Sequence, residues 1–325
     1  MSGCQLTESR VHGFTSVVLA NDWLSVAMVP HLGSKLMSLY DRKHEYEWLW
    51  TNPLLTHLRP LSTTHSEEQF ELGGWDECFP GLSAARYPVP PWNAFDIPKH
   101  GDLWSHAWKK TVVENSSARI AICMSTEGNR LPYRFERTLA IQAGEPVLHF
   151  SYRLHNTSSV PMPFVWSSHP LLRAEPGMRV FLPEGTRAWV DNALPAGILE
   201  AGAVVDWPYV AVKKVVRNLS EVLPDTEGWA AKLYTVGLTD GRIVVENPAR
   251  GRRLLYNFAL SDVTHAGVWL NYGGWGGLEM RPAYHIGVMP CIGGADDLQI
   301  AIQRGEYGVL PAAGEKTWEL RVTLE

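Results

Sequence analysis

The sequence predicts an all-β protein, built as a large antiparallel sandwich with few short helices. Three observations support this fold class. Short runs rich in β-branched and aromatic residues recur along the chain, and clusters of turn residues separate them. No window of about 12 residues or more shows a helical period with capping residues at its ends. The 22 prolines and 28 glycines fit a chain of many strands and turns.

The strand-like runs follow one another from the N-terminus to the C-terminus. The clearest lie at residues 16–20, 24–29, 119–124, 147–154, 242–246 and 319–324. Turn signals between the later runs are Thr239-Asp240-Gly241, Pro248-Ala249-Arg250-Gly251 and Ala313-Gly314-Glu315. The best short helical candidates are residues 66–71 and 218–223.

The chain reads as a single domain over residues 1–325. A β-sandwich can run to about 200–250 residues as one domain, so no linker is required. We find no internal repeat of fixed period. The proline-rich stretch at residues 87–92 is too short for a linker and is interpreted as a rigid loop that leads to His100.

Charge and composition exclude several classes of protein. The net charge of -5 argues against a general nucleic-acid binder. No stretch reaches the roughly 18 apolar residues of a membrane helix, and the N-terminus lacks the basic start and apolar run of a secretory signal. None of the four cysteines forms a C-x-x-C pair, so a zinc ribbon is not expected. We expect a cytoplasmic monomer or homodimer with no nucleic-acid or membrane partner.

The most informative part of the chain is the segment 73–80 together with residues 100–104. It places three carboxylates, a histidine and two indoles among turn residues. Indole faces stack on the C–H faces of a pyranose, and carboxylates and imidazole move protons on its hydroxyls. In an extended chain the adjacent Asp76 and Glu77 point in opposite directions, so at most one faces a pocket. This composition favours a sugar-binding site that contains His100.

Aromatic and basic residues elsewhere extend this interpretation. The chain has 14 Trp but only 9 Phe. Trp104 and Trp275, the latter in a glycine-rich stretch at residues 269–279, are candidate stacking platforms for a sugar, with core packing as the alternative for each. Arg86, with Arg173 and Arg281, could bind a sugar phosphate, although scattered arginines usually lie on the surface.

A metal site is not expected from the sequence. His100 and His106 are six residues apart and would share one face of a strand, but no third ligand stands at a suggestive spacing. Cys78 and Cys291 are interpreted as buried apolar residues, because no activating partner is evident for either.

Four segments together resemble the aldose 1-epimerase (galactose mutarotase-like) superfamily, closest to its divergent, hexose-phosphate-epimerase-like branches. In order, they are residues 30–36, Cys78-Phe79-Pro80 followed by His100-Gly101, Ser168-His169-Pro170, and residues 290–298. The resemblance runs from about residue 10 to the end of the chain. It implies a single β-supersandwich, a small-molecule sugar substrate and no cofactor.

The resemblance also implies roles for particular residues. The family's histidine in the H-P element protonates the ring oxygen, which corresponds to His169 as the acid, and His100 would orient or polarise the substrate. The family's base is the glutamate before the last proline, and Met289 stands at that position here. A thioether takes up no proton near pH 7, so Glu279 is the tentative base. Asp76 and Glu77 are the other candidates for this role.

The leading functional prediction is an aldose 1-epimerase that interconverts the anomers of a hexose or modified sugar. Two alternatives stay open. Met289 at the base position favours a non-catalytic carbohydrate-binding or sensing protein on the same fold. The third reading is a lyase or isomerase that acts on an oxidised sugar in the same pocket, using the histidines with Asp76 and Glu77.

Overall fold

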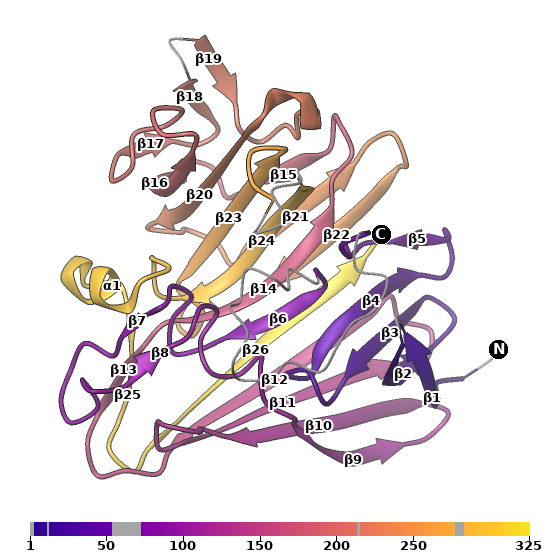
Figure 1. The fold of residues 1–325 in the computed structure, drawn as a ribbon. Coiled ribbons are helices and arrows are strands. Elements are labelled where there is room, and N and C mark those ends of the chain that lie inside the picture. The colour runs from indigo at the N-terminus through magenta and orange to yellow at the C-terminus, as the bar shows by residue number, and fades with distance from the viewer. Residues whose placement is uncertain (1–2, 12, 54–72, 213–214, 277–282) are drawn as a thin grey trace.

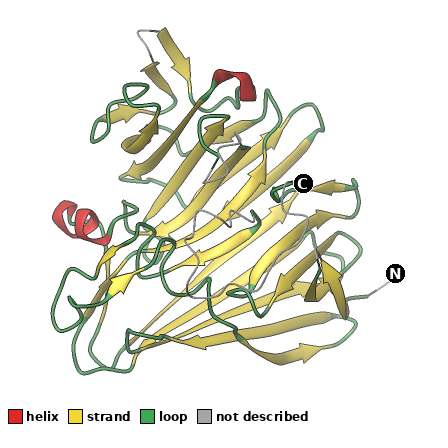
Figure 2. Ribbon diagram, viewed as in Figure 1, coloured by secondary structure: helices red, strands yellow, loops and turns green. Residues whose placement is uncertain are grey.

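Two large antiparallel sheets dominate the protein, as Figures 1 and 2 show. The computed structural model describes residues 3–11, 13–53, 73–212, 215–276 and 283–325. The predicted class, an all-β antiparallel supersandwich with few short helices, is confirmed. No helix among the described residues is long and apolar enough to cross a membrane.

The first sheet has 12 strands, and two of them contain the predicted site residues Asp76, Glu77 and His169. In spatial order its strands are β1 (Gln5–Val11), β2 (Phe14–Ala20), β3 (Leu24–Val29), β4 (Lys35–Asp41), β6 (Trp75–Cys78), β14 (Trp166–Arg173), β24 (Tyr284–Ile292), β23 (His265–Tyr272), β20 (Trp229–Val236), β16 (Arg187–Leu194) and β17 (Val204–Asp206), with β5 (Tyr46–Glu47) paired to β4.

The second sheet has eight strands. In spatial order they are β15 (Arg179–Phe181), β21 (Arg242–Asn247), β22 (Arg252–Asn257), β26 (Glu315–Leu324), β12 (Val147–Asn156), β11 (Tyr133–Gln142), β10 (Arg119–Glu127) and β9 (Lys109–Asn115). Three strand pairs lie outside the two sheets: β13 (Met162–Phe164) with β25 (Gly308–Leu310), β18 (Tyr209–Val212) with β19 (Val215–Asn218), and β7 (Ala85–Arg86) with β8 (Asp96–Ile97).

Two short helices are present in the described part of the chain. One is a 3-10 turn at Asp225–Glu227, and the other is α1 (Leu298–Arg304), which Asp297 caps at its start and Gly305 ends in a left-handed conformation. The helix predicted at residues 218–223 is wrong, because these residues end β19 and form a turn. The candidate at residues 66–71 lies outside the described residues.

The burial patterns explain why the sequence forms these strands. β26 alternates between buried and exposed residues, as expected of a sheet with one face on the core and one in water. By contrast, β14 is buried at every position but its last, and β24 at every position but its first. These two strands lie in the middle of the large sheet and are covered on both faces.

The core between the sheets is unusually rich in tryptophan. Trp75 of the first sheet packs against Phe150 of the second, with ring centroids 5.1 Å apart, and Trp166 meets Trp318 at 4.9 Å. The aromatic side chains therefore join the two layers, and for these tryptophans the core reading of the sequence holds.

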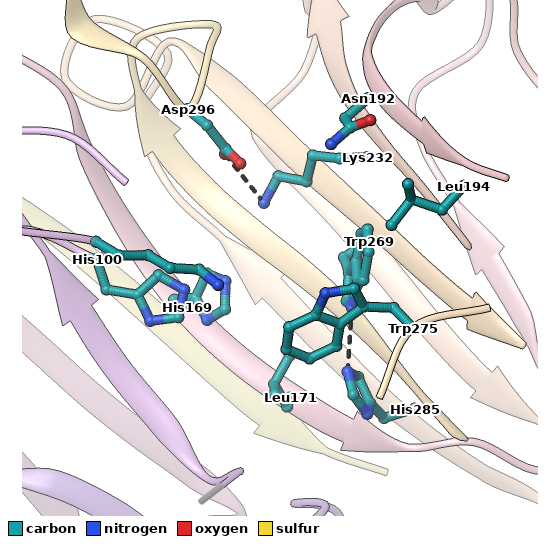
Figure 3. A pocket seen from close by; sticks show the side chains of 11 residues that line it. His100, His169, Leu171, Asn192, Leu194, Lys232, Trp269, Trp275, His285 and Asp296 are labelled. Atoms are coloured by element: carbon teal, nitrogen blue, oxygen red, sulfur yellow. Dashed lines mark hydrogen bonds and ion pairs between the residues drawn. The ribbon is translucent and has the colours of Figure 1, made fainter. Parts of the chain in front are cut away.

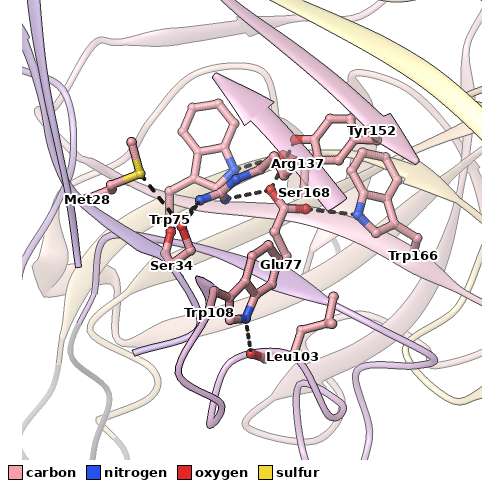
Figure 4. Close-up of polar contacts among 10 residues, drawn as sticks. All are labelled: Met28, Ser34, Trp75, Glu77, Leu103, Trp108, Arg137, Tyr152, Trp166 and Ser168. Carbon is pink, nitrogen blue, oxygen red and sulfur yellow. Dashed lines mark hydrogen bonds and ion pairs between the residues drawn. The ribbon is translucent and has the colours of Figure 1, made fainter. Parts of the chain in front are cut away.

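An ion pair lies inside this apolar layer (Figure 4). The carboxylate of Glu77 accepts from Arg137 Nη1 at 3.0 Å, from the Tyr152 hydroxyl at 3.0 Å and from Trp166 Nε1 at 2.8 Å. Arg137 also donates to the main-chain oxygen and the hydroxyl of Ser34. Both ionic side chains are fully buried, so Glu77 holds core strands together and does not face solvent.

Candidate functional site

The strand registers of the first sheet place one row of side chains on the same face. Asn192 of β16 lies opposite Lys232 of β20, which lies opposite Trp269 of β23. The row continues through Gly287 of β24 to Leu171 of β14. Directly opposed residues of antiparallel strands point to the same side of the sheet, so residues far apart in the sequence form one surface.

This surface is the floor of a cavity of about 150 Å³ (Figure 3). The cavity is lined by Lys99, His100, His169, Leu171, Asn192, Leu194, Lys232, Trp269, Trp275, His285 and Asp296. Sites for drug-sized ligands usually enclose roughly 300–1,000 Å³, whereas a cavity of about 150 Å³ takes a ligand of one six-membered ring. The dimensions therefore suit a single sugar unit.

The two histidines predicted for the site lie in contact on one side of the cavity. The ring centroids of His100 and His169 are 4.8 Å apart. His169 belongs to β14, where it is opposite Asp76 of β6, and it is 8% exposed. His100 comes from the loop after β8. The structure thus brings together two residues that are 69 positions apart in the chain.

The backbone around His100 is held in an unusual conformation. His100 has a φ of 60° and Gly101 a φ of 76°. A side chain at position 101 would place its Cβ 2.0 Å from the carbonyl oxygen of Phe79, so only glycine fits there. The amide of His100 donates to the carbonyl of Leu82 at 2.6 Å. Left-handed backbone at a non-glycine residue costs about 1–3 kcal/mol and clusters at functional sites.

Both imidazoles are neutral at physiological pH. Burial, followed by the charges of Lys99, Lys35 and Lys232, lowers the pKa of His100 to about 3. Burial likewise lowers the pKa of His169 well below its usual value, and His100 and two of these lysines add to the effect. A neutral imidazole carries one N–H donor and one free acceptor nitrogen, so each ring can donate a hydrogen bond and accept a proton.

Lys232 and Asp296 face the histidines across the cavity (Figure 3). Lys232 is 4% exposed, and its Nζ lies 3.6 Å from Asp296 Oδ1 and 2.9 Å from the sulfur of Met289. Asp296 also accepts a hydrogen bond from the Tyr234 hydroxyl. A buried ammonium has three donors to satisfy, and a thioether is a weak acceptor. Lys232 therefore has capacity to bind an oxygen atom of a ligand.

A second carboxyl group stands behind Asp296. The main-chain amide of Asp296 donates to Asp191 Oδ1 at 3.3 Å. Asp191 sits at the register shift between Val190 and Asn192 in β16, which turns it out of the regular ladder. Burial, together with the negative charge of Asp296, raises the pKa of Asp191 to about 7.

Indole rings form the remaining wall. Trp275 meets Trp269 edge to face at 6.2 Å, and the side chain of Asn271 holds the main chain of Trp275 by two hydrogen bonds of 3.0 and 3.1 Å. Trp269 Nε1 donates to His285 Nε2 at 3.1 Å. Burial lowers the pKa of His285 to about 3, so this ring is neutral as well. The wall offers aromatic faces with fixed orientation.

Asp76 and Glu77 point to opposite sides of β6, as the sequence predicted for adjacent residues of a strand. Asp76 forms an ion pair with Lys35 at 2.6 Å, next to His169 but outside the cavity lining. Glu77 lies in the core with Arg137. Neither carboxylate lines the cavity: Asp76 lies beside His169 on the same face of the sheet, and Glu77 lies on the core side.

Three other predicted residues have different locations. Trp104 does not line the cavity; its Nε1 donates to the carbonyl of Lys99 at 2.8 Å and so supports the loop that carries His100. Arg86 is exposed, pairs with Asp96 at 3.6 Å and does not line the cavity. Glu279 lies outside the described residues.

Met289 occupies the interior of β24, one residue before Pro290, and is fully buried. It pairs with Gly267 of β23. A Cβ at Gly287 would lie 2.2 Å from the Met289 methyl carbon, so glycine at 287 makes room for this side chain. The position that the resemblance assigns to the base thus holds a packed thioether beside an ammonium group.

Sequence reasoning missed Lys232, Asp296, Asn192 and His285 as site residues. Lys232 left one usable signal, because a lysine between Ala231 and Leu233 interrupts an apolar strand-like run. Asp296 lies in a segment that the resemblance singled out, but nothing there gave it a role. The others depend on strand register, which the sequence does not reveal.

The donor set favours acid–base chemistry. Among the described residues, no group of three or more His, Cys, Asp or Glu side chains is placed to hold a metal ion. Neutral imidazoles, an ammonium and a carboxylate surround one small cavity with aromatic walls. Such groups can move protons on the oxygen atoms of a bound ring.

Comparisons with known proteins agree with the architecture. No protein-family model and no curated protein matches the chain. Among solved structures, a putative aldose 1-epimerase from Klebsiella pneumoniae superposes with a TM-score of 0.67 at 12% identity, over 99% of this chain and 87% of that one. A putative aldose 1-epimerase from Escherichia coli K12 gives 0.66 at 13%, over 99% of both chains.

A galactose mutarotase-like protein from Clostridium acetobutylicum also gives a TM-score of 0.66 at 13% identity, over 99% of both chains. A TPR-domain containing protein from Parabacteroides distasonis matches at 0.64 and 13% identity, and this chain spans 47% of its length. At such identities the likeness shows the fold alone. The chain has the fold of galactose mutarotase-like proteins.

Proposed function

We propose that the protein interconverts the anomers of a monosaccharide by acid–base ring opening, as an aldose 1-epimerase-like enzyme. One observation carries the proposal: two imidazoles in contact, with ring centroids 4.8 Å apart, face a cavity of about 150 Å³ with indole walls. The fold shared with proteins named aldose 1-epimerase or galactose mutarotase-like supports it.

Anomer exchange requires two coupled proton movements. The proton of the anomeric hydroxyl leaves while the ring oxygen receives one, the C1–O5 bond opens, and the aldehyde rotates and closes again. Each proton transfer by a positioned group contributes about 10²–10⁴-fold. His169 is the proposed proton-transfer group, and His100, beside it, orients the ring.

The test is nuclear magnetic resonance exchange spectroscopy on a panel of free hexoses, hexuronic acids and hexose phosphates. The wild-type protein is expected to accelerate exchange between α and β anomers of at least one sugar above the buffer rate. His169→Asn should remove most of this gain without altering the circular dichroism spectrum. Turnover by His169→Asn equal to that of the wild type would contradict the proposal.

The sequence analysis named Glu279 as the tentative base, and a substitution tests that role separately. Glu279→Gln should lower turnover by about 10²-fold or more if Glu279 takes the anomeric proton. Activity within a few-fold of the wild type would exclude that role.

The second candidate function is carbohydrate binding without turnover, and Met289 at the base position favours it. The same spectra distinguish the two, because sugar signals would broaden or shift without faster exchange. Appearance of a new product, in place of a second anomer, would select the lyase or isomerase alternative.

A further inference from the structure

The charge beside position 289 is opposite in sign to the one that the resemblance implies. The resemblance places an anionic carboxylate at position 289 and an acid at His169. Here position 289 is a thioether, a lysine ammonium lies against it, and the imidazole is neutral. Lys232 therefore puts a positive charge beside the position where the resemblance implies an anionic base.

We propose that Lys232 gives the proton to the sugar ring oxygen and that His169 takes the proton of the anomeric hydroxyl. This inference rests on the proposed function and assigns the acid and the base within it. It makes a glutamate at position 289 unnecessary, because the neutral imidazole supplies the base.

The location of Lys232 supports its role as the donor. The side chain lines the cavity and is almost fully buried. Its neighbours in the row across the sheet are Asn192 and Trp269, so the stem is held between fixed strands. The ammonium contacts a thioether at 2.9 Å and a carboxylate at 3.6 Å, a distance longer than a direct hydrogen bond. A donor hydrogen therefore remains available to a ligand oxygen.

Asp296 lies beside this ammonium group and is itself held in place. Its carboxylate is fixed by the Tyr234 hydroxyl, and its carbonyl accepts from the amides of Leu82 at 2.8 Å and Ser83 at 2.9 Å. Asp296 is thus a positioning residue, and Lys232 is the catalytic residue of the pair.

The side chain of His169 lines the cavity beside His100 and faces Lys232 across it. Burial and the nearby lysine charges hold it in the neutral form, which has a free ring nitrogen. When it takes the anomeric proton, the electron pair of that O–H bond forms the C1=O double bond and the C1–O5 bond breaks. O5 takes the proton of Lys232. After rotation about C1–C2 the steps reverse, so both residues return to their starting states.

The pH dependence of turnover tests this assignment. An imidazolium acid at His169 would make kcat/KM fall as the pH rises through about 6.5, the usual histidine value. A neutral imidazole base predicts no such fall between about pH 5 and 8. The charged and titratable groups that face the site from the surrounding elements are His100, Lys99, Lys35, Asp76, His285, Asp191, Tyr234, Asp296 and Asp297.

Asp191 is the one group of this set with a pKa raised to about 7. The profile is therefore measured in the wild type and in Asp191→Asn, which removes that titration. A kcat/KM that stays constant between about pH 5 and 8 in Asp191→Asn supports the inference, even where the titration of Asp191 changes kcat/KM in the wild type. A fall of kcat/KM near pH 6.5 in Asp191→Asn would overturn it.

Substitution of Lys232 provides the second test. Lys232→Met keeps an unbranched side chain, one heavy atom shorter, and removes the ammonium group. It should lower kcat by about 10²–10⁴-fold with a smaller change in KM. Lys110→Met, on the outermost strand of the second sheet, is the matched lysine control and should leave turnover unchanged. Circular dichroism checks that both variants fold.

Chemical rescue separates catalysis from a structural role. Lys232→Ala leaves space for a small amine, and added ethylammonium should restore part of the lost kcat in proportion to its concentration. Lys232→Met within three-fold of the wild type, or Lys232→Ala without rescue, would overturn the inference while the proposed function stands. A wild-type protein that exchanges no anomers would overturn both.

Discussion

Two ion pairs in this protein show how burial can serve different purposes. In the core, both oxygens of the Glu77 carboxylate accept hydrogen bonds from protein groups, and neither Glu77 nor Arg137 is exposed. In the cavity, Lys232 and Asp296 are 3.6 Å apart, and the Asp296 side chain keeps 27% of its surface exposed. A charge surrounded by protein partners holds strands together, whereas one with an incomplete set of partners can bind a ligand.

The largest difference between the two pairs is expected in stability. Arg137→Met leaves the Glu77 carboxylate buried without its cation, which should cost about 3–5 kcal/mol. Lys232→Met should cost less than about 1 kcal/mol, because Asp296 keeps its bond from Tyr234 and remains partly in water. Urea unfolding of both variants measures these values. Equal losses would show that the cavity pair is structural too.

The next effect concerns activity at the histidine side. His100→Asn keeps a residue that tolerates a left-handed backbone but removes the ring. We expect turnover to fall about 100-fold, equivalent to about 2.7 kcal/mol, with little change in stability. The matched control is His149→Asn on β12, which lies in the second sheet and outside the cavity. Loss of activity in the control would point to a general effect of histidine removal.

A smaller effect is expected at the aromatic wall. Trp275→Ala removes a ring face that the Asn271 side chain holds in place. Sugar affinity should fall about ten-fold, or about 1.4 kcal/mol, while Trp275→Phe keeps most of it. Isothermal titration with the sugar selected by the exchange spectra measures both. An unchanged affinity in Trp275→Ala would remove this indole from the binding site.

The smallest effect concerns the loop that carries His100. His106 Nε2 lies 3.2 Å from Asp102 Oδ1. The hydrogen bond that His106 donates to Asp102, opposed in part by burial, raises the pKa of His106. Burial acts against the shift at Asp102, but the hydrogen bond and charge of His106 bring the pKa of Asp102 below its usual value.

The sign of the pH effect follows from these directions. A histidine whose pKa is raised in the folded protein contributes its full stability below its pKa in the unfolded chain. This stability is lost as the pH rises through its pKa in the folded protein. An aspartate whose pKa is lowered in the folded protein contributes stability above its pKa in the unfolded chain. This stability is lost as the pH falls through its pKa in the folded protein. The pair should therefore stabilise most between about pH 4.5 and 6. His106→Gln should lose about 0.5–1 kcal/mol at pH 5.5 and less at pH 8 in urea unfolding. The same loss at both values would contradict the expected linkage.

Much of the fold could be predicted from the sequence, because strand signals are local. The run at 24–29 matches β3 at both ends, since apolar residues fill it and turn residues flank it. The helix α1 was missed although Asp297 and Gly305 cap it. Its seven residues are too few to display a helical period, so no periodic apolar pattern lay between the two capping residues.

Prediction of the site was uneven for a physical reason. His100 and His169 stand in short motifs beside glycine or proline, so the sequence marked them individually. Lys232 is recognised as a cavity residue only from its neighbours across the sheet. These neighbours depend on the register of all the strands together. Trp104 was predicted as a stacking platform but bonds to the Lys99 carbonyl, a contact that no local pattern encodes.

The size of the cavity has a consequence for the form in which a sugar can arrive. Among the described residues, the lining encloses about 150 Å³, with the His100 loop at one side and indoles at the other, and the proposed function needs room for only one sugar ring there. A polymer could present only its terminal residue. Under the proposed function, the expected substrates are therefore free monosaccharides with an unblocked reducing end.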